Sequence, residues 1–505
     1  MAAMETPAAG DDWLSGLPDC LLEDVLSRLS SRQAAPTSVL SRRWRHLWRT
    51  LPCVDIDQRE FRTATPSELD AFEDLGDVLL PPRHCTSPPP PDLDTLRLRV
   101  TSQNFPTAQR WIRRGLRCHP AAFHLHCDKD DNVVNVFDRA AIVTTWPEFP
   151  GLGMDLHSER RLRTLHLSGL TLPPDLATDV ATGYRALEAL HLADCRYQFT
   201  SLASCSLKEL SIVRCERDFL ASEPLLLAVP SVVSLRISVQ FHAGASMRHL
   251  RSLHLSGLSL SSDFAKDVAG EYTALEALRL DDCRHDFTRL ASCTLTELSV
   301  VHCHHKYLDA SEPLLLAVPS VVSLRIHGRG GTARVNSECE MPSVVTASLT
   351  CLARVYEGFL SSLRHARTLN LSGFRFRALL GSDNEPADDG FPVFHRLMAL
   401  HLHECNVGVH GQMLLRFLQN SPSLETLKVS NGALVDDSGS RWSMVIAGPA
   451  VYECKNLRSM ELEFWGHCAV EELAQTLVGS ISKQAVQPIQ TFVGDGKSRV
   501  EISFA

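Results

Sequence analysis

The chain lacks the features of secreted, membrane-spanning and nucleic-acid-binding proteins. Residues 1–12 hold neither a basic start nor an apolar core, so we expect no secretory signal peptide. The longest apolar runs, such as Leu225 to Val229, are far shorter than the roughly 20 residues of a transmembrane helix, so we expect no membrane association. The net charge is −9, from 50 basic and 59 acidic residues, and a chain without surplus Lys and Arg is unsuited to general nucleic-acid binding.

Cysteine is abundant, but its arrangement is not that of a disulfide or zinc protein. None of the 16 cysteines belongs to a Cys-x-x-Cys pair, and without a secretory signal we expect reduced thiols in the cytosol or the nucleus. The runs His302-Cys303-His304-His305 and His401-x-His403-x-Cys405 suggest zinc ligands. A zinc site usually needs four converging ligands, however, and strand alternation sends neighbouring residues to opposite faces. We therefore expect neither a metal nor any other cofactor.

Catalytic motifs are missing as well. The chain has no Gly-x-Ser-x-Gly elbow and no phosphate-binding loop of the Walker type. Gly328-Arg329-Gly330-Gly331 is rich in glycine but lacks a following Lys-Ser or Lys-Thr, so we expect a simple loop. A hydrolase or a metalloenzyme is thus a remote interpretation, and the sequence favours a protein that binds other proteins without catalysing a reaction.

Two amphipathic patterns lie near the start of the chain. In the first, Pro18 suits the first position of a helix, and Glu23 and Asp24 place negative charge near its positive end. The apolar residues of the two patterns follow helical spacing and are Leu21, Leu22, Val25, Leu26 and Leu29, then Val39, Leu40, Trp44, Leu47 and Trp48. Helices of this size are marginal alone, so we expect the rest of the chain or a partner to cover them.

The same residues form an ordered motif. Leu17-Pro18-Asp19-Cys20-Leu21-Leu22 precedes Leu26-Ser27-Arg28-Leu29 and the run from Ser38 to Trp48. This module, residues 11–52, resembles the F-box of plant F-box proteins. The resemblance implies that it binds a Skp-type adaptor and, through the adaptor, a cullin. The residues implied to contact the adaptor are Leu17, Pro18, Leu21, Leu22, Val25, Leu26, Val39, Leu40, Trp44 and Trp48. Some of these ten must instead pack the core of the module, and the sequence does not separate the two sets.

Pro36 departs from the F-box pattern, which usually has a residue other than proline there, often arginine. If the second helix starts near Ala34 or Ala35, Pro36 lies in its first turn and costs little. If the helix starts earlier, an interior proline costs about 3 kcal/mol and bends the adaptor-binding surface.

The chain after the module contains a tandem duplication. We expect a connector over residues 53–92, with a helix over 67–80 and a Pro-rich spacer at 87–91. Residues 161–238 and 249–327 are then near copies, with an offset of 88 residues that later becomes 89. Leu165-His166-Leu167-Ser168-Gly169-Leu170, for example, recurs from Leu253 to Leu258.

Each copy contains smaller repeats built on a Leu-x-Leu core. These cores begin at residues 165, 190, 210, 235, 253, 278, 298 and 324, in steps of 18 to 26 residues. Such a period is typical of leucine-rich repeats, in which each short strand buries its alternate apolar residues against its neighbours. We therefore predict an α/β fold, a leucine-rich-repeat solenoid with a curved parallel sheet over residues 93–440, behind the small helical module.

Two further features follow from this interpretation. The recurring Cys195, Cys215, Cys283, Cys303 and Cys405 are expected to hydrogen-bond the backbone in the turn after each strand. Residues 441–505 are expected to form degenerate last repeats, with a helix over 470–481, and they faintly resemble the FBD region of plant F-box/leucine-rich-repeat proteins.

The middle residue of each Leu-x-Leu core should point to the concave, solvent-facing side of the sheet. Many of these positions hold basic residues, such as Arg97 and His124, and few hold acids, such as Glu461. Ser211, Ser299 and Asn370 are neutral members of the same row. Exposed strand residues are commonly polar, which explains the row simply; the alternative hypothesis is that the row binds an acidic or phosphorylated partner. The candidates for that role are His166, His191, Arg236, His254, Arg279, Arg325, His401 and Lys428.

The sequence thus predicts the substrate-recognition subunit of a cullin-type ubiquitin ligase, itself without catalytic chemistry. The F-box would bind the adaptor, and the repeats would hold a target protein close to the ubiquitin-charged enzyme. The alternative is a leucine-rich-repeat binding scaffold without a role in ubiquitination, in which Pro36 has disabled adaptor binding.

Overall fold

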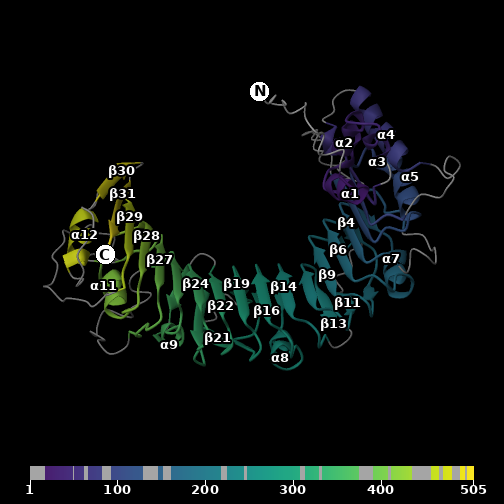
Figure 1. The fold of residues 1–505 in the computed structure, drawn as a ribbon. Helices are drawn as coiled ribbons and strands as arrows, with labels where there is room; N and C mark the ends of the chain where they lie inside the picture. Colours follow the sequence, from purple (N-terminus) through teal and green to yellow (C-terminus); the bar gives the residue numbers. More distant parts are fainter. Residues whose placement is uncertain are drawn as a thin grey trace, which may run out of the picture. The chain divides into compact units, whose positions relative to one another are not determined.

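The computed structural model divides the chain into two compact units, Met1–Met247 and Arg248–Ala505. Figure 1 shows the elements of both units, coloured along the sequence. The structure describes residues 17–48, 51–61, 66–81, 92–128, 146–151, 161–217, 224–243, 247–306, 313–328, 333–355, 357–374, 391–407, 411–434, 456–465, 470–479, 490–494 and 497–504. The Pro-rich spacer predicted at 87–91 and the start of the predicted last repeats at 441–455 lie outside the described residues.

The first unit opens with four short helical segments. They are α1 (Asp19–Ser27), α2 (Ser31–Ala34), the 3₁₀ helix η1 (Ala35–Val39) and α3 (Trp44–Leu47). The helix predicted after Pro18 is confirmed, but the second amphipathic pattern, from Val39 to Trp48, covers the end of η1 and α3 and is not one helix. Ser30 caps α2, because its hydroxyl oxygen accepts a hydrogen bond from the Gln33 amide at 3.3 Å.

Parallel strands follow the helical module in chain order. The described strands of the main sheet are β1 (Cys53–Asp57), β2 (Thr95–Thr101), β3 (Ala122–Asp128), β4 (Thr164–Ser168), β6 (Ala189–Ala193), β9 (Glu209–Val213) and β12 (Ser234–Ile237). Strand β1 lies inside the predicted connector, so the sheet starts earlier than the sequence indicated. The helix predicted over 67–80 is present as α4 (Pro66–Leu79), and it packs on α5 (Phe105–Leu116) through Phe72 and Trp111, whose ring centroids are 5.1 Å apart.

Short elements join these strands on the far side of each repeat. In the first unit they are η2 (Gln58–Glu60), β5 (Thr171–Leu172), α7 (Asp175–Thr178), the π-helix η4 (Asp179–Gly183), β7 (Arg196–Tyr197), β8 (Ser201–Ala203), β10 (Glu216–Arg217), β11 (Leu225–Ala228) and β13 (Phe241–Ala243). β5, β7 and β10 form one small parallel sheet, and β8, β11 and β13 form another.

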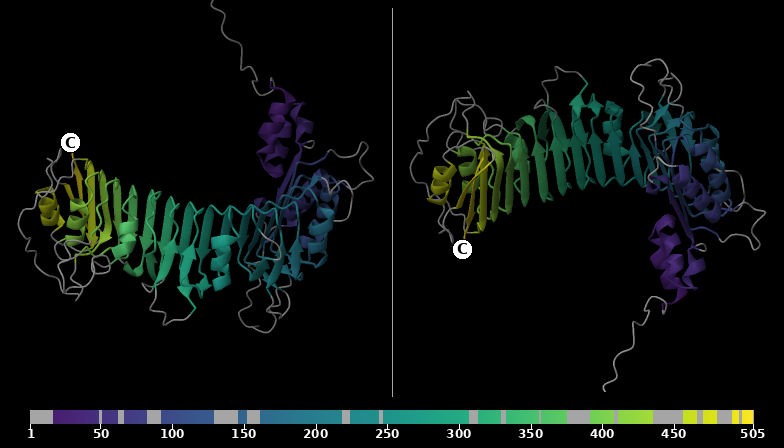
Figure 2. Two further views of the ribbon diagram at one scale, coloured as in Figure 1. Left: turned by 90° about the horizontal axis from the view of Figure 1, so that it is seen from below. Right: turned by 90° about the horizontal axis from the view of Figure 1, so that it is seen from above.

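The second unit repeats this architecture. Its parallel strands are β14 (Ser252–Ser256), β16 (Ala277–Asp281), β19 (Glu297–Val301), β22 (Ser323–His327), β24 (Thr346–Thr350), β26 (Thr368–Ser372), β27 (Ala399–His403), β28 (Thr426–Gly432) and β29 (Ser459–Trp465). Two antiparallel strands then close the sheet, β31 (Lys497–Ser503) beside β29 and β30 (Gln490–Gly494) beside β31. Figure 2 shows the closely spaced strands of each unit from two more sides.

The connecting elements of the second unit match those of the first in kind. They are β15 (Ser259–Leu260), α8 (Ser262–Gly270), β17 (Arg284–His285), β18 (Arg289–Ala291), β20 (His304–His305), β21 (Leu314–Ala317), β23 (Ala333–Ser337), β25 (Leu352–Val355), α9 (Glu357–Ser362), α11 (Gln412–Gln419) and α12 (Val470–Gly479). No helix among the described residues is long and apolar enough to span a membrane.

Alternate burial along the strands creates the core. Leu165 and Leu167 of β4 are fully buried, and His166 between them is half-buried on the opposite face. The same alternation holds in the other repeats, as leucine-rich repeats require. The predicted α/β fold, a helical module followed by a leucine-rich-repeat solenoid, is therefore confirmed.

The recurring cysteines lie in the turns after the strands, as predicted. Asp194, for example, has a positive φ of 51° and turns the chain, and the buried Cys195 thiol then donates to the Ala193 carbonyl at 3.2 Å. Cys215, Cys283, Cys303 and Cys405 make the same bond to the carbonyl two residues earlier. Burial raises the pKa of the Cys405 thiol to about 11, which suits a structural cysteine and not a reactive one.

Gly169 and Gly257 provide a matched test of repeat packing, because they occupy the same position in the two copies. Both have positive φ, 75° and 70°, so alanine costs each about 1–2 kcal/mol of backbone strain. A Cβ at Gly169 would lie 2.0 Å from the Cys127 carbonyl oxygen, whereas one at Gly257 meets nothing within 4 Å. We predict that Gly169→Ala lowers the free energy of unfolding by about 1–3 kcal/mol more than Gly257→Ala does. Urea unfolding measures this difference as a lower midpoint for Gly169→Ala. Equal midpoints for the two variants would contradict this packing.

Candidate functional site

The helical module exposes apolar side chains from two of its elements. Leu21 and Val25 of α1 are 49% and 46% exposed, and Val39 at the end of η1 is 84% exposed. Leu40, which follows Val39, is also more than half exposed, and Leu29 borders on exposure. A small module seldom leaves so many large apolar side chains in water unless another protein covers them. We call Leu21, Val25, Leu29, Val39 and Leu40 the exposed apolar set.

Burial separates the ten residues that the F-box resemblance assigned to the adaptor. Leu22, Leu26, Trp44 and Trp48 form the core of the module with Ala34 and Leu51, and Leu17 packs partly against that core. These four buried residues therefore stabilise the module, as was expected for some of the ten, and the adaptor contacts stay a prediction. Of the ten, the exposed ones are Pro18, Leu21, Val25, Val39 and Leu40.

Pro36 lies in the first turn of η1 and is exposed. The chain changes from α-helical to 3₁₀-helical geometry at Ala35, just before Pro36, and η1 continues directly from α2 because Ala34 and Ala35 both have α-helical φ and ψ. The Thr37 hydroxyl donates to the Ala34 carbonyl oxygen at 2.6 Å and satisfies one carbonyl at this junction. Pro36 thus lies in the first turn of the 3₁₀ segment, while the helical run that contains it begins at Ser31.

The module is attached directly to the first strand of the sheet. The Ser31 hydroxyl oxygen accepts a hydrogen bond from the Asp55 amide of β1 at 2.9 Å, and the Ser30 hydroxyl donates to Glu60 at 2.8 Å. The Arg32 guanidinium lies 4.3 Å from the ring centroid of Phe61. Because β1 has β2 as its strand partner in the described residues, the module covers the other edge of β1.

The solvent-facing side of the first unit carries a row of histidines. His124, His166 and His191 stand at equivalent register on β3, β4 and β6, and their ring centroids are 5.7 and 5.6 Å apart. Burial, helped by the positive charge of Arg97 and the neighbouring imidazoles, lowers the pKa of His124 to about 4. Burial also lowers the pKa of His166. These two imidazoles are therefore neutral near pH 7.

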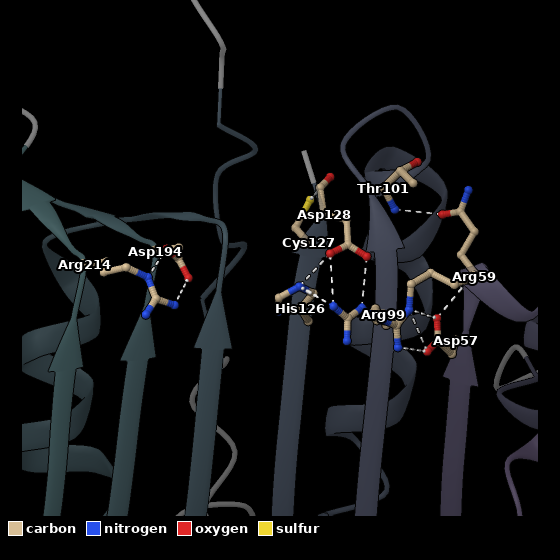
Figure 3. A network of polar contacts seen from close by, with 10 residues as sticks. Asp57, Arg59, Arg99, Thr101, His126, Cys127, Asp128, Asp194 and Arg214 are labelled. Carbon is tan, nitrogen blue, oxygen red and sulfur yellow. Dashed lines mark hydrogen bonds and ion pairs between the residues drawn. The ribbon is translucent and has the colours of Figure 1, made fainter. Parts of the chain in front are cut away.

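The carboxylates around this row already have partners (Figure 3). The Arg99 guanidinium donates to both oxygens of Asp128, at 2.9 and 3.2 Å, and Arg59 binds Asp57 at 2.6 Å. Burial acts to raise the pKa of Asp128, but hydrogen bonds from Arg99 and His126 outweigh it and hold that pKa below its ordinary value. Asp194 likewise binds Arg214 through two contacts of 2.7 Å.

The candidates in the second unit are more heavily engaged by acids. Asp281 lies 2.5 Å from His254 Nε2, Glu297 lies 3.9 Å from Arg279, and Glu461 lies 2.7 Å from Lys428. The hydrogen bond from Lys428 lowers the pKa of Glu461. In the described parts of the chain, Arg236 of the first unit and Arg325 of the second have no carboxylate within ion-pair distance.

All eight candidate residues thus lie between buried strand positions on the solvent-facing side, but they differ in charge environment. Sequence reasoning missed this difference because it treated the residues as one row. The signal that it could have used is the comparison of the two copies, since Ala193 of the first copy corresponds to Asp281 of the second. Among the described residues, no group of three or more His, Cys, Asp or Glu side chains is placed to hold a metal ion.

The depressed pKa of His124 predicts how stability depends on pH. The folded-state pKa is about 4 and the ordinary value is 6.5, so below about pH 6.5 the unfolded chain takes up a proton that the folded chain refuses. The contribution of His124 to stability is therefore full above about pH 6.5 and is lost as the pH falls towards about 4. We predict that His124→Asn reduces the loss of unfolding free energy between these pH values. The ring resonance of His124 should not titrate above about pH 5, and a midpoint near 6.5 would contradict the structure.

Comparisons with known proteins agree with these features. The F-box domain family matches residues 14–55. The meiotic F-box protein MOF of Oryza sativa subsp. japonica is 30% identical over 469 residues, which are 90% of this chain and 80% of that protein. An FBD-associated F-box protein of Arabidopsis thaliana is 24% identical over 460 residues, 90% of this chain and 86% of that protein. F-box/LRR-repeat protein 13 of Arabidopsis thaliana is 48% identical over 67 residues, 13% of this chain and 15% of that protein. The chain therefore belongs to the family of plant F-box proteins, with leucine-rich repeats behind its F-box.

Proposed function

We propose that this protein is the substrate-recognition subunit of a cullin-type ubiquitin ligase. Its F-box binds a Skp-type adaptor, and its repeats hold a target protein for ubiquitination. The observation that carries the proposal is the exposed apolar set of the F-box, Leu21, Val25, Leu29, Val39 and Leu40, on a module whose own core is complete without it. The chain contributes proximity, because it raises the effective concentration of the target near the ubiquitin-charged enzyme.

The attachment of the F-box to β1 supports this role. The contacts of Ser30, Ser31 and Arg32 with the first repeat join the adaptor-binding module to the first strands of the solenoid by hydrogen bonds and packing. A target held on those strands is then presented at a defined distance from the adaptor. We propose the cytosol or the nucleus as the location of this function, because the cysteines of the described residues are free thiols.

Adaptor binding is tested with the double variant Val39→Asp/Leu40→Asp. Both side chains are exposed, so the module should still fold, while two carboxylates in an apolar interface should weaken capture of a purified Skp-type adaptor by at least about tenfold. Leu226→Asp is the matched control, because Leu226 is an apolar strand residue with 45% exposure outside the F-box. Titration calorimetry with the adaptor measures both. Unchanged binding by the double variant would refute the proposed adaptor surface.

The alternative function, a repeat scaffold without a role in ubiquitination, depends on Pro36. Because Pro36 is exposed in the first turn of η1, we predict that Pro36→Arg changes the affinity for the adaptor by less than about threefold. The same calorimetric titration checks this. If the natural chain fails to bind the adaptor and Pro36→Arg binds it, the scaffold is the correct interpretation.

A further inference from the structure

Five neighbouring strands of the first unit carry hydrogen-bond donors at the same register. His124 pairs with His166, His166 with His191, His191 with Ser211, and Ser211 with Arg236. We call these five residues the donor strip. A neutral imidazole offers one N–H donor, a hydroxyl offers one O–H, and a guanidinium offers five N–H groups, so each member can donate to an anion.

The donor strip is poor in internal acceptors. In the described residues, Glu209 is the carboxylate within ion-pair distance of the strip, and it lies 3.9 Å from His191, which is the outer limit of such a contact. Arg236 is exposed and has no carboxylate of the described residues within that distance. Asp55, which lies in line with the strip on β1, has Arg97 at 3.7 Å, and the flanking Asp128 is held by Arg99. The donors of the strip are therefore available to a ligand.

In the second copy, a carboxylate of the chain itself occupies the equivalent of this surface. His254 corresponds to His166, and Asp281 corresponds to Ala193. In the second copy Asp281 binds the His254 imidazole at 2.5 Å, while in the first copy the methyl group of Ala193 leaves His166 without that acceptor. The pairing register is the same in both, because Ser168 pairs with Ala193 as Ser256 pairs with Asp281.

We propose that the donor strip of the first unit binds an acidic segment of the target protein, with the peptide extended across the strands. This inference rests on the proposed receptor function and names the chemistry that the receptor recognises. Carboxylates of the segment accept hydrogen bonds from the imidazoles and Ser211, and Arg236 supplies a full positive charge at one end. Burial lowers the pKa values of His124 and His166, so each imidazole is neutral near pH 7 and offers one N–H to a carboxylate without adding a positive charge.

The spacing of the donors favours an acidic peptide over a single phosphate group. Neighbouring strands lie 4.7–4.9 Å apart, so the five donors extend over about 19 Å. One phosphate group reaches donors that converge on a point, whereas an extended peptide at about 3.3 Å per residue covers this length with about six residues. The arrangement therefore matches several carboxylates in a row.

The experiment uses the full chain and a fluorescein-labelled peptide of alternating Glu and Ser, with the Gln-Ser version as the neutral control. Fluorescence anisotropy at low salt measures binding. We expect the Glu peptide to bind more tightly than the Gln peptide, and Arg236→Gln to weaken it by about threefold. Ala193→Asp should weaken binding of the Glu peptide at least as much, because the new aspartate gives His166 the internal carboxylate that His254 has in the second copy. The second copy shows that the fold accepts an aspartate at this position.

Several outcomes would overturn the proposal. Equal binding of the Glu and Gln peptides excludes recognition of acidic residues, and unchanged affinity in both Arg236→Gln and Ala193→Asp excludes the donor strip. Displacement of the peptide by inorganic phosphate at a concentration similar to that of unlabelled Glu peptide would show a single-anion site instead. Binding of the adaptor is measured separately on the same preparations. Adaptor binding without peptide binding refutes this inference alone, and peptide binding without adaptor binding refutes the receptor function.

Discussion

Alternate burial along short parallel strands is the constraint on which both units depend. A strand such as β4 has apolar residues on one face, and it cannot cover them by itself. Its leucines are removed from water when the strands before and after it stack at the same register. The turn that ends each strand follows from this requirement, because the αL residue and the buried cysteine return the chain while satisfying backbone carbonyls. Function is then left to the residues that face solvent, which the core does not constrain.

The F-box covers the exposed edge of the first strand of the sheet. A first strand has an unpaired edge, and β1 has its edge covered by the Ser31 hydroxyl and by the packing of Arg32 on Phe61. The same contacts that cover the edge also join the F-box to the first strands of the solenoid. Stability and geometry are thus served by one small interface in the first unit.

The tandem duplication shows how the solvent-facing surface can differ between two copies of one fold. The buried residues of the copies are nearly the same, so the backbone register is the same. Ala193 and Asp281 differ in a position that faces solvent, and the difference decides whether a neighbouring histidine has an internal acceptor. The exchange of alanine for aspartate does not disturb the core, because neither side chain belongs to the core. The exchange alters the electrostatics of one copy and leaves the fold unchanged.

The sequence by itself determined the fold and the family, because both depend on local patterns. The period of the Leu-x-Leu cores and the motif from Leu17 to Trp48 are legible without coordinates. The tertiary structure alone separated Leu21 and Val25 from Leu22 and Leu26, because neighbouring positions on one helix satisfy the same periodicity and only packing decides which face is covered. The tertiary structure also decided which basic strand residues form an ion pair with a carboxylate. Asp281 reaches His254, and Glu461 reaches Lys428, because the repeats bring their strands side by side.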